Sequence, residues 1–125
     1  MNEQPAAPLV LIAEDEEPIV DVVSTVVEDA GYTPLVAVHG REALDLARAQ
    51  HPALLITDLM MPYLSGAELI AQLQADAASG GRALMPIILM TAASLSLARA
   101  AGADAVLRKP FDLAQLEDLL ERFLG

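Results

Sequence analysis

Mostly apolar runs of four or five residues alternate along the chain with segments whose apolar residues recur every three or four positions. The short runs predict strands buried on both faces, because such strands show no regular alternation of apolar and polar residues. These strands lie at residues 9–13, 35–38, 54–57, 86–90 and 104–107. The periodic segments predict helices with one buried face, at about 19–30, 41–50, 65–79, 95–101 and 112–123.

Residues that start and stop helices agree with these limits. Pro18 suits a first helical turn, and Gly31 suits a C-terminal stop. Ser65 and Glu68 have the spacing of a capping box, and Asp112 is a typical N-cap residue. Strands that alternate with helices in this way predict an α/β fold, in which right-handed crossovers build a parallel sheet of five strands flanked by five helices.

The length of 125 residues fits one domain. We expect that domain to span residues 9–125, after a short disordered lead-in at residues 1–8. The chain has no cysteine, which excludes a disulfide framework, a thiolate zinc site and a cysteine nucleophile. Its net charge of −11 argues against direct binding to nucleic acid or to an anionic membrane. Without a secretory signal or an apolar run long enough to cross a membrane, the chain is predicted to be cytoplasmic.

Polar side chains follow four of the five predicted strands. Glu14 and Asp15 come after the first strand, Asp58 after the third, Thr91 after the fourth and Lys109 after the fifth. Ligands of open parallel sheets bind beyond the carboxyl ends of the strands. We therefore expect three carboxylates, one hydroxyl and one ammonium to surround a single crevice.

This set of groups indicates phosphoryl transfer. Carboxylates held close together repel one another, and a bound cation relieves the repulsion. Oxygen ligands of this kind favour Mg²⁺ or Ca²⁺ over zinc. A carboxylate beside Mg²⁺ can attack phosphorus to give an aspartyl phosphate, and Thr91 and Lys109 could contact the oxygens of the transferred group.

Several motifs in this order resemble the receiver domain of two-component response regulators. The resemblance runs from about Leu9 to Leu124 and is specific because the motifs share both order and spacing. The motifs are LIAEDE at 11–16, GREAL at 40–44, ITDLMMP at 56–62, LMTA at 89–92, AGAD at 101–104 and LRKPF at 107–111.

The resemblance implies a flavodoxin-like three-layer sandwich with strand order 2-1-3-4-5. It also implies that Asp58 is the phosphoacceptor and that a sensor histidine kinase or a histidine phosphotransfer protein is the donor. Mg²⁺ would be bound directly by Asp15 and Asp58, by Glu14 directly or through water, and by the backbone carbonyl of Met60. The phosphorylated domain would then signal to a downstream effector protein or domain.

The resemblance assigns roles to two further residues. Thr91 would hydrogen-bond the phosphoryl group and report its presence by moving. Lys109 would pair with the phosphoryl oxygens, and its peptide bond to Pro110 would be cis. Lys109 is also the only lysine of the chain, since every other cationic residue is an arginine. An ammonium is a compact point charge that a guanidinium does not replace.

Simpler interpretations exist for single residues. Thr91 could cap the next helix, and Asp58 could be an ordinary turn residue. Together, however, such interpretations require independent coincidences at four strand ends, so we prefer the functional one. Glu16 and Glu17 are interpreted as solvated loop residues outside the site. His39 and His51 are interpreted as surface residues, because no metal-ligand partner has a usable spacing.

Two departures from the family pattern bear on switching. Val106 stands where many receivers carry a Tyr or Phe that swings inward as the threonine moves, and the stretch from Thr91 to Gly102 is about one helical turn short. We therefore expect a short fourth helix, and a signal that passes more through the first helix or the loop after Asp58. Met60 and Ala93 also stand where polar side chains can place a hydrolytic water, so intrinsic dephosphorylation is predicted not to be fast.

The favoured function is a Mg²⁺-dependent phosphoacceptor switch, which catalyses only its own phosphorylation and dephosphorylation. One alternative is a binding or dimerisation module that keeps the fold without using phosphate, and the sequence leaves a homodimer open. A hydrolase acting on phosphate esters through Asp58 is a weaker alternative. Such an enzyme needs an acid two residues further on, and Met60 cannot supply one.

Overall fold

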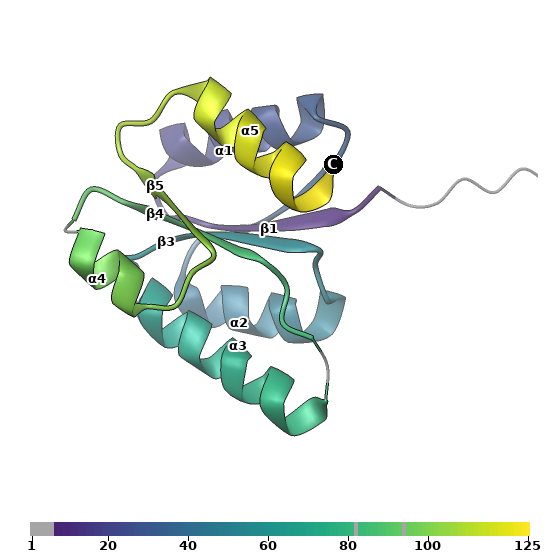
Figure 1. Cartoon of the computed structure of the whole chain (residues 1–125), viewed down its shortest axis with the longest axis vertical. Coiled ribbons are helices and arrows are strands. Elements are labelled where there is room, and N and C mark those ends of the chain that lie inside the picture. Colours follow the sequence, from purple (N-terminus) through teal and green to yellow (C-terminus); the bar gives the residue numbers. More distant parts are fainter. Residues whose placement is uncertain (1–6, 82, 94) are drawn as a thin grey trace, which may run out of the picture.

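A five-stranded parallel sheet lies between two layers of helices (Figure 1). The computed structural model describes residues 7–81, 83–93 and 95–125. Its strands are β1 (Leu9–Ala13), β2 (Thr33–Ala37), β3 (Leu54–Asp58), β4 (Ile87–Thr91) and β5 (Ala105–Arg108). The strand order is β2-β1-β3-β4-β5, with every neighbouring pair parallel, which confirms the predicted fold and strand order.

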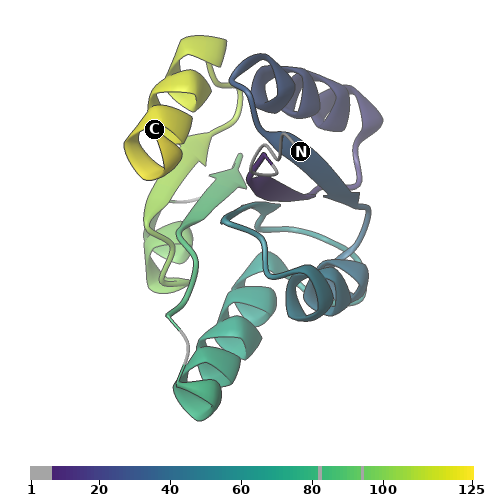
Figure 2. The same cartoon turned by 90° about the vertical axis from the view of Figure 1, so that its right-hand side faces the viewer.

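The helices divide between the two faces of the sheet. One face is covered by α1 (Glu17–Asp29) and α5 (Leu113–Leu124). The other is covered by α2 (Gly40–Gln50), α3 (Gly66–Gly80) and α4 (Leu95–Ala100). Turning the molecule by 90° shows the same arrangement, with α1 and α5 above the strands and α2 and α3 below them (Figure 2). The three layers match the predicted sandwich.

Successive residues of each strand enter opposite cores, which explains why the strands are apolar without alternation. Leu11 and Leu55 belong to the core under α2 and α3, whereas Ile12 and Ile56 belong to the core under α1 and α5. All four side chains are fully buried. Side chains on a strand point alternately to the two faces, so a sheet covered on both faces needs apolar residues at both.

Some predicted strand limits were wrong by one or two residues. β2 begins at Thr33, two residues earlier than predicted, and Pro34 is paired with Val10 of β1. A proline lacks the backbone N–H, but an edge strand such as β2 tolerates this loss. β5 begins after Asp104, whose carboxylate accepts a hydrogen bond of 2.8 Å from the backbone N–H of Ile87. The backbone N–H of Asp104 donates in turn to the carbonyl oxygen of Ile87 at 2.9 Å, so both the side chain and the backbone of Asp104 connect the start of β5 to β4.

The helix signals read from the sequence are confirmed in several places. Ser65 and Glu68 form the predicted capping box, with both hydrogen bonds at 3.1 Å. Asp112 is the N-cap residue of α5. Gly31 follows α1 with a φ of +94°, a conformation that glycine adopts without strain. α4 has only 6 residues, as the short stretch before Gly102 predicts.

The predicted lead-in falls at residues 1–8, of which residues 1–6 lie outside the described part of the chain. Within the described residues, no helix combines the length and the apolar character needed to cross a membrane.

Candidate functional site

The carboxyl edge of the sheet gathers the polar residues that the sequence places after its strands. Asp58 and Thr91 are the last residues of β3 and β4, and Glu14 and Lys109 directly follow β1 and β5. β3 lies between β1 and β4 in the sheet, so Asp58 stands near the middle of this edge. The backbone N–H of Lys109 donates to the carbonyl oxygen of Thr91 at 2.8 Å, which holds these two residues side by side.

Lys109 joins two carboxylates. Its Nζ donates to Oε1 of Glu14 at 2.7 Å and to Oδ2 of Asp58 at 3.1 Å. The Lys109 side chain is only 14% exposed, and the peptide bond to Pro110 is cis, as the family resemblance predicts. A single, largely buried ammonium at the end of β5 therefore bridges two carboxylates at the ends of β1 and β3.

Glu14 is fully buried, and the structure satisfies both of its carboxylate oxygens. Oε1 accepts from Lys109, while Oε2 accepts from the backbone N–H groups of Asp15 and Glu16 at 3.0 and 3.1 Å. Burial raises the pKa of Glu14 above its ordinary value, although the hydrogen bonds from Lys109 and Glu16 oppose this effect. The charge of Asp58 raises the pKa of Glu14 further.

The ammonium of Lys109 is stabilised by the two carboxylates that it contacts. Burial by itself lowers the pKa of Lys109, but the hydrogen bonds to Glu14 and Asp58 and the charges of these residues outweigh it. The pKa of Lys109 is consequently raised, so the side chain stays charged at neutral pH. The site therefore holds a permanent positive charge beside Asp58.

Asp58 is nearly buried, with 6% of its surface exposed. Its Oδ2 accepts from Lys109, and its Oδ1 accepts from the backbone N–H of Met60 at 3.3 Å. Gly66 lies directly behind it, because a Cβ at this position would overlap the carbonyl oxygen of Asp58. The carboxylate is thus held from both sides while the residue keeps a small exposed surface.

A third carboxylate joins this group. Oxygen atoms of Glu14, Glu16 and Asp58 all lie within 4.8 Å of one another, and among the described residues they form a group that could hold a metal ion. Asp15, the predicted direct ligand, is exposed and lies outside that group. Glu16 is exposed, as expected, but its place in the group differs from the prediction that it lies outside the site. Glu16 is the N-cap residue of α1, and its extended backbone, with φ −88° and ψ 110°, is a local conformation that the apolar pattern does not encode.

Thr91 has a buried hydroxyl that holds the start of the following loop. Its Oγ1 accepts from the backbone N–H of Ala93 at 2.8 Å, and the residue is 1% exposed. This contact resembles the capping role considered from the sequence, but it lies in the loop before α4 and not at the helix itself. Because the oxygen accepts this bond, the hydroxyl proton is available for donation to another group.

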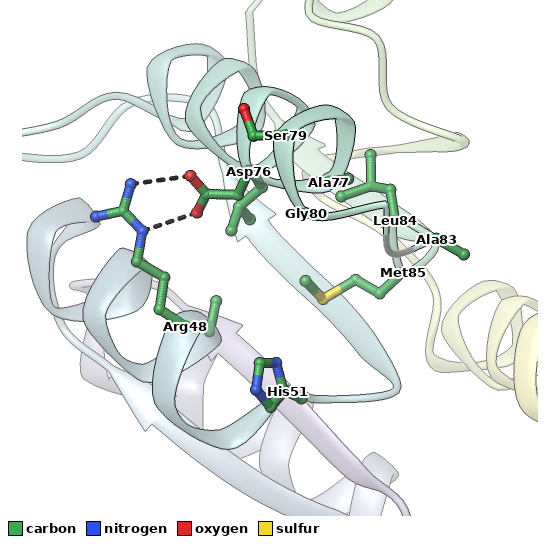
Figure 3. A pocket seen from close by; sticks show the side chains of 11 residues that line it. Arg48, His51, Asp76, Ala77, Ser79, Gly80, Ala83, Leu84 and Met85 are labelled. Carbon is green, nitrogen blue, oxygen red and sulfur yellow. Dashed lines mark hydrogen bonds and ion pairs between the residues drawn. The ribbon is translucent and has the colours of Figure 1, made fainter.

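A cavity of about 480 Å³ lies at the other end of the molecule (Figure 3). It is formed by the last turns of α2 and α3 and by residues 83–85 before β4. Arg48 and Asp76 face each other across it, with hydrogen bonds of 2.7 and 3.2 Å. None of the predicted site residues lines this cavity, so the charged groups of the candidate site and the cavity are separate features.

The sequence matches the family described as the response regulator receiver domain across residues 10–121. The chain belongs to this family. It is 31% identical to the polar-differentiation response regulator DivK of Brucella ovis, and the match covers 93% of this chain and 95% of DivK. It is 34% identical to response regulator Rre1 of Synechocystis, covering 96% of this chain but only 53% of Rre1. The chain therefore spans about half the length of that relative.

Solved structures agree with the family assignment. The chemotaxis response regulator CheY4 of Vibrio cholerae superposes with a TM-score of 0.83 at 30% identity, covering 95% of this chain and 100% of CheY4. The fold and the family predicted from the sequence are thus confirmed. The roles of the individual site residues stay predictions.

Proposed function

We propose that this protein is a phosphorylation-controlled switch in which Asp58 accepts a phosphoryl group from a phosphohistidine donor in a Mg²⁺-dependent reaction. The observation that carries the proposal is the pairing of Lys109 with Asp58 and Glu14 beside a third carboxylate, that of Glu16. A receiver needs a carboxylate nucleophile, a fixed cation and a place for a divalent metal at one point. The carboxyl edge of the sheet offers a candidate for each of the three, which supports the proposal.

The donor set fits Mg²⁺. Carboxylate oxygens are the hard ligands that Mg²⁺ prefers, and it commonly takes one or two of them together with water and phosphate oxygens. Asp58, Asp15 and the backbone carbonyl of Met60 are the proposed ligands. Glu16 is added to them because its carboxylate lies in the same group. When bound, the ion supplies positive charge to the phosphoryl oxygens.

Glu14 has a different proposed role from the exposed acids. Both of its oxygens already accept hydrogen bonds, and the side chain is fully buried. A direct bond from Glu14 to the metal would break some of these contacts. We therefore assign Glu14 the indirect role, in which it acts through water and through its charge and keeps Lys109 in place.

The reaction follows from the groups around Asp58. A carboxylate oxygen of Asp58 attacks phosphorus, the phosphorus–nitrogen bond to the donor imidazole breaks, and its electron pair returns to the imidazole nitrogen, which takes a proton from solvent. Lys109 is already within hydrogen-bond distance of Asp58 and can turn to a phosphoryl oxygen. Thr91 has a hydroxyl proton to donate to another phosphoryl oxygen.

The consequence is a change of conformation and not turnover of a substrate. Phosphorylation adds negative charge at a site that already carries several carboxylates, so the contacts of Lys109 and Thr91 change when it occurs. We propose a histidine kinase or a histidine phosphotransfer protein as the donor and an effector protein or domain as the recipient of the signal. A cytoplasmic location and a possible homodimer belong to the same proposal.

The test compares wild type with Asp58→Asn, using Asp118→Asn on the exposed face of α5 as a matched control. Each protein is incubated with Mg²⁺ and acetyl phosphate, or with Mg²⁺ and beryllium fluoride, and followed by intact mass and by amide chemical shifts. A mass increase of one phosphoryl group that requires Asp58 and Mg²⁺ supports the switch. An unchanged wild type supports the phosphate-independent binding module, and steady release of phosphate from esters supports the hydrolase.

A further inference from the structure

The loop after Asp58 contacts the turn that begins α2. Residues 59–65 connect β3 to α3 and include Met60. At the tip of this loop, the ring of Tyr63 packs edge-to-face on the ring of His39, with centroids 5.0 Å apart and an interplanar angle of 74°. His39 is the N-cap residue of α2, so two segments distant in sequence meet beside the candidate site.

The backbones of the same two segments also touch. A Cβ added to Gly40 would overlap the carbonyl oxygen of Leu64 and crowd its Cβ. Only glycine allows this close approach of two backbones. Gly40, the first residue of α2, therefore lies in direct backbone contact with the loop.

The α2 side of this contact is firmly held. The Nδ1 atom of His39 accepts from the backbone N–H of Glu42 at 3.1 Å, and Oε1 of Glu42 accepts from the backbone N–H of Val38 at 2.9 Å. The bond from Glu42 to His39 is an N-cap contact, and the carboxylate of Glu42 reaches back one residue beyond the N-cap, to Val38. The turn at residues 38–42 thus gives the loop a support whose shape is fixed by its own hydrogen bonds.

The loop side depends more on outside support. Tyr63 has a φ of +69°, which is uncommon for a bulky residue and persists only where surrounding contacts require it. The residue is 85% exposed and makes few contacts, so the ring contact with His39 is an important one. The backbone N–H of Leu64 donates to the carbonyl oxygen of Pro62 at 2.8 Å, which makes the tip a tight turn.

We propose that His39 and Gly40 are positioning residues for the phosphoacceptor loop. They hold Tyr63 and Leu64, and so fix the backbone of Met60, whose N–H donates to Asp58 and whose carbonyl is a proposed Mg²⁺ ligand. This inference rests on the proposed function. Because energetic coupling between two sites is reciprocal, Mg²⁺ binding also strengthens the contact between the loop and the start of α2.

The experiment measures Mg²⁺ affinity in the folded protein by amide chemical shifts and by calorimetry. Gly40→Ala pushes the loop away and is expected to weaken Mg²⁺ binding about fivefold or more. Gly80→Ala is the matched control, because a Cβ there meets no described atom within 4 Å apart from its chain neighbours and the backbone of its own helix, and the affinity is expected to stay unchanged. His39→Asn keeps an N-cap acceptor but loses the ring contact, and it is expected to weaken binding about two- to tenfold.

The outcomes separate positioning from simple stability. Unfolding midpoints of the same variants are measured in urea, and the proposal requires the Mg²⁺ affinity to fall in protein that is fully folded. If Gly40→Ala does not fold, His39→Asn decides the question. If wild type, Gly40→Ala and His39→Asn bind Mg²⁺ with equal affinity, the positioning role alone is overturned. A wild type that binds no Mg²⁺ overturns this role together with the proposed function.

The reciprocal readout uses the ring contact itself. Mg²⁺ is expected to shift the resonances of the His39 and Tyr63 rings in wild type, and to leave the Tyr63 ring unshifted in His39→Asn. Tyr32, which lies before β2 on the α1 face, serves as an internal reference. An unshifted Tyr63 ring in Mg²⁺-saturated wild type contradicts the proposed coupling.

Discussion

The Nζ atom of Lys109 lies 2.7 Å from Oε1 of Glu14, a residue 95 positions away in the sequence. Glu14 is fully buried, so its negative charge is stabilised by this contact and by the two backbone N–H groups that donate to Oε2. Removing one partner of a buried ion pair leaves the other charge uncompensated. The contact therefore links the stability of the fold to the chemistry of Asp58, which the same ammonium contacts.

Lys109→Met is expected to abolish phosphorylation and to lower the free energy of unfolding by about 3 kcal/mol, because Glu14 is left buried without its cation. Lys109→Arg keeps the charge on a wider head group, so we expect it to retain more of the stability than of the phosphorylation rate. Urea denaturation and acetyl phosphate labelling measure the two effects. Full stability in Lys109→Met is the contradicting result.

The stability loss of Lys109→Met also depends on pH. Burial raises the pKa of Glu14 in the folded protein, and removing Lys109 takes away a hydrogen bond that lowers it. A carboxyl whose folded pKa is raised contributes stability below its unfolded pKa and loses it as pH rises through the folded value. The variant is therefore expected to be closest to wild type near pH 4 and to fall behind as pH rises. Urea midpoints across this range test it, and a constant difference contradicts the assignment to Glu14.

The apolar pattern predicted the fold well because the sheet is covered on both faces. The strand Leu54–Asp58 is buried along its whole length, and it appears in the sequence as an apolar run that ends in polar residues. Polar residues at the ends of such runs stand out for the same reason, and this is how Asp58 and Thr91 were found. The resemblance then supplied the strand order and the cis peptide bond at Pro110, which periodicity does not contain.

What the sequence did not reveal depends on tertiary packing. Glu16 enters the carboxylate group because of its extended backbone at the N-cap of α1, and its sequence neighbours do not distinguish it from Glu17. His39 looked like a surface residue, although it caps α2 and supports Tyr63. The close approach of Gly40 to Leu64 joins two loops whose distance is set only when the sheet has formed.

Glu16→Gln is expected to weaken Mg²⁺ binding about tenfold, because it removes one charge from the carboxylate group. Glu17→Gln is the matched control, since Glu17 lies outside that group. Asp15→Asn tests the predicted direct ligand in the same titration. If Glu17→Gln and Glu16→Gln bind Mg²⁺ alike, Glu16 is not part of the metal site.

Thr91→Ala is expected to slow phosphorylation and to lower the free energy of unfolding by about 1 kcal/mol, because the backbone N–H of Ala93 loses its acceptor. Thr91→Ser keeps the hydroxyl and is expected to recover most of the rate. Single-turnover labelling at saturating Mg²⁺ separates the chemical step from metal binding. Equal rates in all three proteins would show that the hydroxyl takes no part in the transfer.

The aspartyl phosphate is expected to last longer than a few seconds at room temperature without a phosphatase. Met60 and Ala93 offer no polar side chain to place a hydrolytic water, and Met60 is 70% exposed, so a polar residue fits there without disturbing the core. Met60→Asn is therefore expected to shorten the lifetime while leaving the unfolding midpoint unchanged. Decay of the wild-type phosphoprotein within a few seconds, followed by intact mass, contradicts the prediction.

The route of the signal is the last prediction. α4 has only 6 residues, and Val106 is a half-buried core residue too small to act as the swinging aromatic of many receivers. The loop at residues 59–65, by contrast, begins directly after Asp58 and contacts the start of α2 through the rings of Tyr63 and His39. Addition of beryllium fluoride with Mg²⁺ is therefore expected to shift amides of this loop, α1 and the start of α2 more than those of α4. Shifts confined to α4 and β5 would instead show that the signal leaves by that face despite the short helix.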